Sequence, residues 1–178
     1  MNRFVVPVLL SLTLALPARA ALDIGEAAPD FTATAAKGGT VFSYSLAEAL
    51  KKGPVVLYFF PAAYSEGCSL EAHLFAEAIP QFEAFGASVV GVSSDGIDSL
   101  SKFSVQACQS KFPVASDETM AVTKAFDAAL KTRPEYANRI SYVIAPNGAI
   151  VSHYMSLNPT KHVEKMLGAL KTWSERPK

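Results

Sequence analysis

The 178-residue sequence has few of the residues that redox and metal sites usually require. It contains two cysteines, Cys68 and Cys108, and no C-x-x-C motif, which excludes the paired-thiol motif of many disulfide-exchange enzymes. Its three histidines are scattered along the chain, and together with two distant cysteines they have poor spacing for metal ligands. We therefore expect neither a bound metal nor a cofactor.

An excess of either charge is also absent, because 16 basic residues balance 16 acidic residues. A protein that binds nucleic acid or an anionic membrane surface usually carries a basic patch, and nothing in this composition indicates one. No apolar run after residue 20 is long enough to span a bilayer, which takes about 20 apolar residues. We expect neither nucleic acid nor a membrane as a partner of the mature chain.

Residues 1–20 have the pattern of a secretory signal peptide. Arg3 supplies a basic start, residues 4–16 are apolar, and Ala18-Arg19-Ala20 matches an A-x-A cleavage site. An uncleaved anchor or a buried helix is the alternative. Cleavage leaves residues 21–178 as one domain with 14 basic and 16 acidic residues, a formal charge of −2. The expected location is periplasmic or secreted, where a disulfide is permitted.

Apolar strands and amphipathic helical stretches alternate along residues 21–178, which predicts an α/β fold with a central mixed sheet flanked by helices. An N-terminal β-hairpin is expected around Gly38-Gly39, and a second hairpin around Pro146-Asn147-Gly148. Pro80 should bend or break the helix that contains it. The expected strands are 31–35, 40–43, 55–60, 88–92, 112–115, 139–145 and 149–154, and the expected helices are 46–51, 68–85, 97–111, 119–130 and 160–173.

Cys68 occupies the most informative position, directly between the buried strand at residues 55–60 and the start of a helical pattern. A cysteine at a helix N-terminus lies among unpaired backbone N–H groups and the positive end of the helix dipole. That field favours the thiolate, which is the nucleophilic form of the side chain. The position predicts a cysteine redox enzyme, and an inert core cysteine is the alternative.

The residues before Cys68 supply other features that a reactive thiolate requires. Pro61 can shield the sulfur from water without presenting an N–H group, and the hydroxyl of Ser65 can both donate and accept a hydrogen bond. Gly67 allows another group to approach the backbone closely, and its amide can point into the pocket.

A permanent cation near the thiolate would complete such a site, and residues 21–178 contain three arginines. Arg176 lies in the C-terminal tail and Arg133 in an expected loop, whereas Arg139 begins a predicted strand. We therefore expect Arg139 to be the cation. Glu71, one helical turn after Cys68, could hold its guanidinium by a bidentate pair, or could remain a solvated acid in the first turn of the helix.

The pattern P-x-x-x-[ST]-x-x-C formed by Pro61, Ser65 and Cys68 resembles the signature of the peroxiredoxins. Residues 57–72, LYFFPAAYSEGCSLEA, are similar to the bacterioferritin-comigratory, or PrxQ-like, branch. This resemblance covers about residues 24–170 and implies a thioredoxin-like fold. It also implies reduction of hydrogen peroxide or alkyl hydroperoxides by Cys68, with Ser65 and Arg139 activating the sulfur and the peroxide, and Pro61 shielding the cysteine.

Two positions depart from that branch. Ser65 replaces the commoner threonine, and His73 stands where the resolving cysteine often lies. The resemblance leaves Cys108 as the candidate resolving cysteine, forming a disulfide with Cys68 that a thioredoxin-like donor would reduce. We expect the two cysteines to start too far apart to bond, so that local unwinding is required.

Two other functions fit the same residues. The chain could be a thioredoxin-like scaffold in which Cys68 and Cys108 form a purely structural disulfide, or a one-cysteine peroxidase resolved by an external thiol. The resemblance favours a monomer. His73, His153 and His162 are interpreted as surface or edge residues without a role, and Tyr58 and Tyr64 as packing residues.

Overall fold

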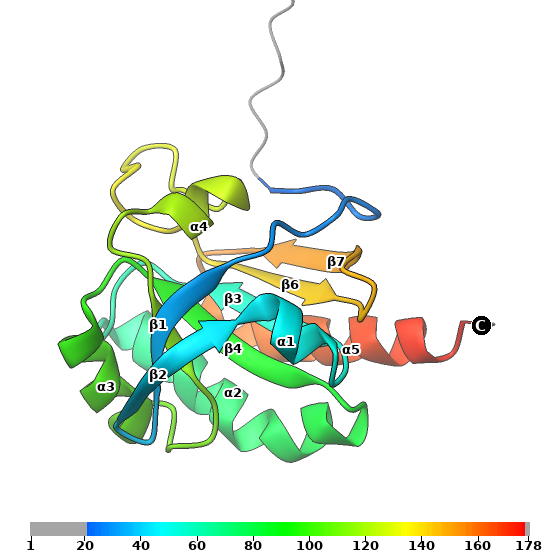
Figure 1. The fold of residues 1–178 in the computed structure, drawn as a ribbon, viewed down its shortest axis with the longest axis horizontal. Helices are drawn as coiled ribbons and strands as arrows, with labels where there is room; N and C mark the ends of the chain where they lie inside the picture. The colour runs from blue at the N-terminus through cyan, green and yellow to red at the C-terminus, as the bar shows by residue number, and fades with distance from the viewer. Residues whose placement is uncertain (1–20, 177–178) are drawn as a thin grey trace, which may run out of the picture.

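Seven strands form one mixed sheet in the order β2-β1-β5-β4-β3-β6-β7, and helices cover both of its faces (Figure 1). The computed structural model describes residues 21–176, so the signal peptide expected at residues 1–20 lies outside the described part of the chain. Strands β3, β4 and β5 run parallel, and all other neighbouring pairs are antiparallel. The strands are β1 (Thr32–Lys37), β2 (Thr40–Ser45), β3 (Val55–Phe59), β4 (Ser88–Ser93), β5 (Val114–Ser116), β6 (Ile140–Ile144) and β7 (Ile150–Met155).

Each face of the sheet has its own apolar core. Helices α2, α3 and α5 pack on one face through buried side chains that include Phe75, Phe103 and Met166. Helices α1 and α4 and the N-terminal segment lie on the other face, where Leu46 and Phe126 are buried. The helices are α1 (Leu46–Leu50), α2 (Glu66–Ala84), α3 (Ile97–Gln106), α4 (Ala121–Ala125) and α5 (His162–Ser174), and a 3-10 turn, Pro159–Lys161, precedes α5.

Strand β3 is buried on both faces because helices cover both sides of the sheet, as its continuous apolar sequence predicts. Tyr58 projects toward β4, and a Cβ atom on Gly91 would lie 2.7 Å from its ring. Glycine at this position therefore leaves room for the tyrosine. The Tyr58 hydroxyl is buried and has no hydrogen-bond partner within residues 21–176.

The predicted α/β class, the mixed sheet and the N-terminal hairpin are confirmed, and the main errors concern where helices end. The helix expected at 97–111 ends at Gln106, so Cys108 lies beyond it rather than within it. Gln109 and Ser110 adopt left-handed backbone angles there, with φ values of 52° and 60°. This reversal directs the chain into β5, and the Ser110 N–H closes the turn by donating to the Ser104 carbonyl at 2.9 Å.

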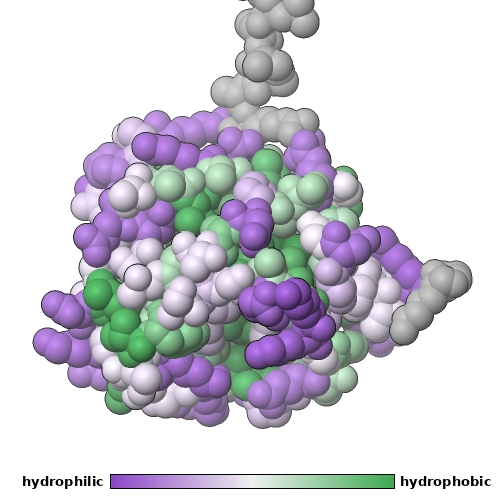
Figure 2. All heavy atoms as spheres, in the orientation of Figure 1, coloured by the Kyte–Doolittle hydropathy of each residue, from purple (hydrophilic) through white to green (hydrophobic). Residues whose placement is uncertain are grey.

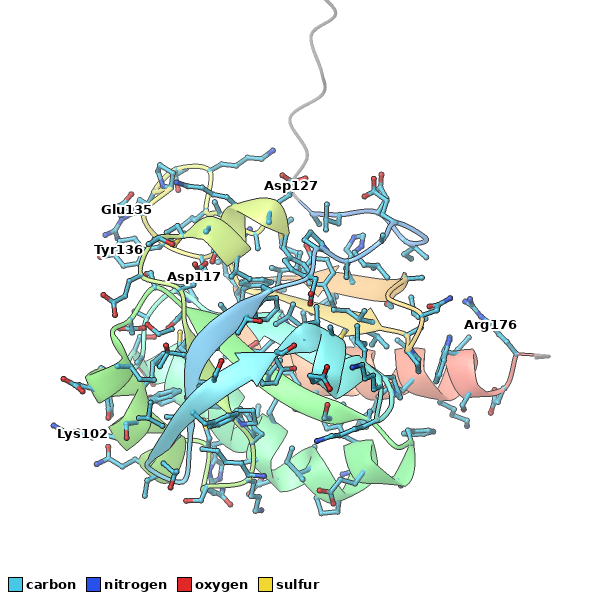
Figure 3. The ribbon with its side chains drawn as sticks, in the orientation of Figure 1. Lys102, Asp117, Asp127, Glu135, Tyr136 and Arg176 are labelled. Carbon is cyan, nitrogen blue, oxygen red and sulfur yellow. The ribbon has the colours of Figure 1, made fainter. Side chains whose placement is uncertain are left out.

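Two further helix predictions need correction. The helix expected at 119–130 is confined to Ala121–Ala125, because left-handed residues flank it, Met120 at φ 59° and Asp127 at φ 51°. Figure 3 labels Asp117 beside this helix, where its carboxylate accepts hydrogen bonds from the Thr123 N–H and hydroxyl, both at 2.7 Å. Helix α2 runs through Pro80 as one helix, so of the bend or break expected there, the break is absent.

The surface over β1, β2 and α1 mixes hydrophilic and apolar residues without one continuous apolar area (Figure 2). Within residues 21–176, no helix combines the length and apolar character needed to cross a membrane.

Candidate active site

Cys68 lies in the first turn of α2 with its side chain buried at 1% exposure. The helix begins here because Ser65 caps it: the Ser65 hydroxyl oxygen accepts a hydrogen bond from the Cys68 N–H at 3.4 Å. The same hydroxyl donates to the Ala62 carbonyl at 3.1 Å. The sulfur is thus placed where the end of β3 meets the positive end of a helix dipole, as the sequence predicts.

Arg139 directly precedes β6, which pairs with β3 so that Ile140 lies opposite Phe59. This pairing places the arginine beside the first turn of α2, although 71 positions separate it from Cys68. Its Nη2 group donates to the sulfur of Cys68 at 3.3 Å, and its Nε group donates to the Leu157 carbonyl at 3.1 Å. The expected neighbour relation between Arg139 and Cys68 is therefore present.

Gly67 makes this approach possible. A Cβ atom at position 67 would lie 3.1 Å from Arg139 Nη2, closer than ordinary van der Waals contact. The sequence indicates a close approach to this glycine, and the structure identifies the group that approaches as the guanidinium of Arg139.

Glu71 lies one turn after Cys68 and is completely buried. Its Oε2 atom accepts a hydrogen bond from Arg139 Nη1, which excludes the alternative of a solvated acid. The contact uses one carboxylate oxygen, so the expected bidentate pair is wrong. Burial raises the pKa of Glu71 to about 8, against the opposing effect of the Arg139 charge.

The prediction that His162 is a surface or edge residue is wrong. Its ring is fully buried, and Nδ1 lies 2.8 Å from the Ser141 hydroxyl and 3.5 Å from Oε1 of Glu71. Burial lowers the pKa of His162 to about 4. A signal for this position exists in the sequence, since His162 precedes the buried residues Met166 and Leu170 by four and eight positions and so shares their helix face.

The loop between β3 and α2 is held by a residue that the sequence analysis did not identify. Asp95 follows β4, and its Oδ2 atom accepts hydrogen bonds from the Ala63 N–H at 2.7 Å and the Ser93 hydroxyl at 2.8 Å. Pro61 lies half-buried at the start of this loop. Since Asp95 ties the loop to the end of β4, the segment from Pro61 to Ser65 has a defined path into α2.

Cys108 is also fully buried and lies in the same apolar core as Cys68. Within residues 21–176, no charged side chain forms a hydrogen bond with its thiol. Burial raises the pKa of its thiol well above the usual value. Both cysteines are free. Next to Cys108, the Gln109 amide lies 2.8 Å from Nδ1 of His73, which connects the Cys108 segment to α2.

The other two arginines take no part in this cluster. Arg133 lies over the ring of Tyr136, 4.3 Å from its centroid, and contacts Glu135 at 3.4 Å. Figure 3 shows Glu135 and Tyr136 in the loop after α4, and Arg176 beyond α5 on the other side of the molecule.

No group of three or more metal-ligating side chains is found within residues 21–176. A hollow of about 630 Å³ lies between β2, α1 and the C-terminal end of α2, and Cys68 does not line it.

Comparison with known proteins identifies the family of this chain. The model of the AhpC/TSA family matches residues 24–153. A putative peroxiredoxin bcp of Helicobacter pylori is 32% identical over 154 residues, which cover 84% of this chain and 98% of that protein. Two crystal structures superpose with a TM-score of 0.76 and cover 86% of this chain and 98% of theirs. They are the peroxidoxin BcpB of Mycobacterium tuberculosis at 28% identity and a PrxQ mutant of Xylella fastidiosa at 29%. The thioredoxin-like fold is thereby confirmed.

Proposed function

The chain belongs to the AhpC/TSA family of peroxiredoxins, which are thiol peroxidases, and we propose that Cys68 is its peroxidatic cysteine, acting on hydrogen peroxide or alkyl hydroperoxides. The observation that carries this assignment is the buried contact between Arg139 Nη2 and the sulfur of Cys68. A guanidinium at hydrogen-bond distance stabilises a thiolate, and the same charge stabilises an oxygen that becomes negative as the O–O bond breaks.

In the first step, the thiolate attacks one oxygen of the peroxide. An S–O bond forms while the O–O bond breaks, and the departing oxygen takes a proton to leave as water or as an alcohol. Cys68 becomes a sulfenic acid. Arg139 stabilises the charge on the departing oxygen, the Ser65 hydroxyl binds the peroxide, and Pro61 keeps water from the sulfur.

In the second step, the thiol of Cys108 condenses with the sulfenic acid, releases water and forms a disulfide. A thioredoxin-like dithiol then reduces this bond by exchange and becomes oxidised itself. The left-handed angles at Gln109 and Ser110 support Cys108 in this role. Such angles cost about 1–3 kcal/mol for each non-glycine residue, so opening this segment relieves strain while it exposes the thiol.

Replacement of Cys68 by serine tests the assignment directly. We expect Cys68→Ser to consume no peroxide when thioredoxin or dithiothreitol is the reductant, because no other thiolate occupies the site. The matched control Ser69→Ala changes the next residue of α2 and retains the thiol. Undiminished turnover in Cys68→Ser would contradict the proposal.

Two alternatives are separated by further observations. In a scaffold that depends on a permanent Cys68–Cys108 disulfide, the reduction potential of that bond would lie below about −300 mV, whereas a cycling pair would have a higher potential. A one-cysteine peroxidase resolved by an external thiol would instead show a persistent sulfenic acid or a mixed disulfide by mass spectrometry after one equivalent of peroxide.

The setting of the reaction is part of the same proposal. The pattern of residues 1–20 supports export to the periplasm or beyond, where the reductant would be an exported thioredoxin-like protein. We also propose that the chain acts as a monomer. Detection of the mature N-terminus and the sedimentation of the purified protein test these two points.

A further inference from the structure

Beside Arg139, three completely buried polar side chains form a chain of contacts: Glu71, His162 and Ser141. His162 Nε2 lies 2.9 Å from the carbonyl oxygen of Ser156. A carbonyl oxygen can only accept, so Nε2 carries a hydrogen and donates. In a neutral imidazole the other nitrogen, Nδ1, is then an acceptor.

This tautomer creates a conflict with Glu71. Oε1 of Glu71 is buried without a hydrogen-bond partner and lies 3.5 Å from Nδ1 of His162, which is itself 2.8 Å from the Ser141 hydroxyl. If the carboxylate is ionised and the ring is neutral, two acceptors face each other in the core, which is unfavourable. One proton on the pair removes the conflict. Carried by Oε1, it lies toward Nδ1, whose one lone pair also accepts from the Ser141 hydroxyl at 2.8 Å; carried by Nδ1, it is shared between Oε1 and the Ser141 hydroxyl oxygen.

We propose that Glu71 and His162 share one buried proton, and that this proton leaves the positive charge of Arg139 available to the sulfur of Cys68. The inference deepens the proposed function and rests on it. His162 does not touch the reacting atoms, so it is a positioning residue that acts through Glu71 and Arg139.

The balance of charges supports this arrangement. With Glu71 ionised, the guanidinium of Arg139 is already neutralised by one carboxylate, and a thiolate at Cys68 would add an unbalanced negative charge to a buried cluster. With the shared proton present, Arg139 and the thiolate balance each other. Burial raises the pKa of Glu71 to about 8 and lowers that of His162 to about 4, so both groups favour their neutral forms.

The charged and titratable groups around the pair come from four elements. Arg139, directly before β6, lies near both members, and its charge opposes protonation of His162. Cys68 shares α2 with Glu71, and Tyr58 of β3 has a pKa raised well above its usual value by burial, so the tyrosine stays neutral. Tyr154 of β7 packs its ring against His162 at 4.9 Å between centroids.

The proposal predicts a pH profile. As the pH rises through about 8, the pair loses its proton, Glu71 neutralises Arg139, and the rate at which the ionised sulfur reacts with peroxide falls. His162→Gln supplies an amide that can donate to the carboxylate but cannot hold the proton. It should move this fall to lower pH by about one unit, equal to a tenfold change in proton affinity. Glu71→Gln is permanently neutral and should remove the fall.

The test is the second-order rate constant with hydrogen peroxide, measured from pH 6.5 to pH 8 and above in the wild type, both variants and the double variant. The proposal requires that His162→Gln has no further effect on the profile when Glu71→Gln is present. If His162→Gln lowers the rate equally at every pH without moving the profile, His162 has only a structural role and the proposal is overturned.

A second measurement needs neither activity nor a variant. The carboxyl carbon of Glu71 and the ring nitrogens of His162 can be followed by NMR in the reduced wild-type protein. We expect a carboxylic acid, or an imidazolium, to persist at neutral pH and to titrate near pH 8. Titration of Glu71 near 4.5 with a neutral ring above that pH overturns the shared proton even if peroxide is consumed. Conversely, the shared proton would still be detected if peroxidase activity were absent.

Discussion

Cys68 and Cys108 lie in the same core between the sheet and its helices, yet their surroundings differ in charge. Cys68 receives a hydrogen bond from Arg139 at 3.3 Å and lies in the first turn of a 19-residue helix. Cys108 follows the end of α3, and its thiol is held neutral by burial in apolar surroundings. Burial by itself therefore does not decide whether a cysteine reacts. The reactivity of a buried cysteine depends on whether a cation and a helix N-terminus lie beside its sulfur.

The largest effect should come from removing the second thiol. We expect Cys108→Ser to abolish turnover driven by thioredoxin, because the sulfenic acid of Cys68 then lacks its intramolecular partner. Mass spectrometry after one equivalent of peroxide should show the added oxygen on Cys68 in place of a disulfide. Full thioredoxin-driven turnover in this variant would exclude Cys108 from the catalytic cycle.

Arg139→Lys tests whether a positive charge beside Cys68 is sufficient without the geometry of the guanidinium. Lysine retains a positive charge but loses the planar group that reaches the sulfur, Glu71 and the Leu157 carbonyl together. We expect the rate constant with peroxide to fall on the order of a hundredfold, as when a donor to a developing negative charge is removed. The measurement is stopped-flow reaction with peroxide, and a change of less than twofold would show that charge without geometry is sufficient.

Gly67→Ala should have a smaller effect of about tenfold on the same rate constant. The added methyl group would lie 3.1 Å from Arg139 Nη2 and displace the guanidinium by a few tenths of an ångström. Gly168→Ala in α5 is the matched control, because nothing lies within 4 Å of a Cβ atom there. Equal rates in both variants would mean that the guanidinium adjusts at no cost.

The smallest predicted effect concerns the Cys108 segment. His73→Ala removes the contact between α2 and Gln109 and should accelerate disulfide formation about fivefold, since one hydrogen bond contributes about 1 kcal/mol. Rapid acid quenching and mass spectrometry would measure the rate. Glu77→Ala is the control, because it removes the other partner of His73 and leaves Gln109 in place. A slower reaction in His73→Ala would show that the contact aligns the segment instead of restraining it.

Most of the cysteine site could be read from residues close in sequence. Pro61, Ser65, Gly67 and Cys68 fall within one strand-to-helix connection, where the order of residues determines the cap and the position of the sulfur. Among the three arginines, Arg139 is distinguished by its place at the start of a predicted strand. The sequence does not decide whether Glu71 binds Arg139 or stays solvated, because that depends on β6 lying beside β3.

The misplaced helix end at Gln106 and the buried His162 have a common cause. Both positions depend on contacts with other elements, which single-sequence periodicity does not contain. The segment from Ala107 to Lys111 carries helix-compatible residues, but the chain must turn there to enter β5 beside β4. His162 shares the helix face of Met166 and Leu170, and a polar side chain on that face requires buried partners that only the fold can supply.

The amino-acid sequence by itself determined the alternation of strands and helices, both hairpins and the place of Cys68 at a helix N-terminus. Each of these follows from side-chain patterns and backbone preferences over a few residues. Tertiary structure decided that Arg139, Glu71 and His162 meet behind that cysteine and that Cys108 lies beyond its helix. These results depend on antiparallel pairing of β6 with β3 and on packing of α5 against β6 and β7, which bring together groups far apart along the chain.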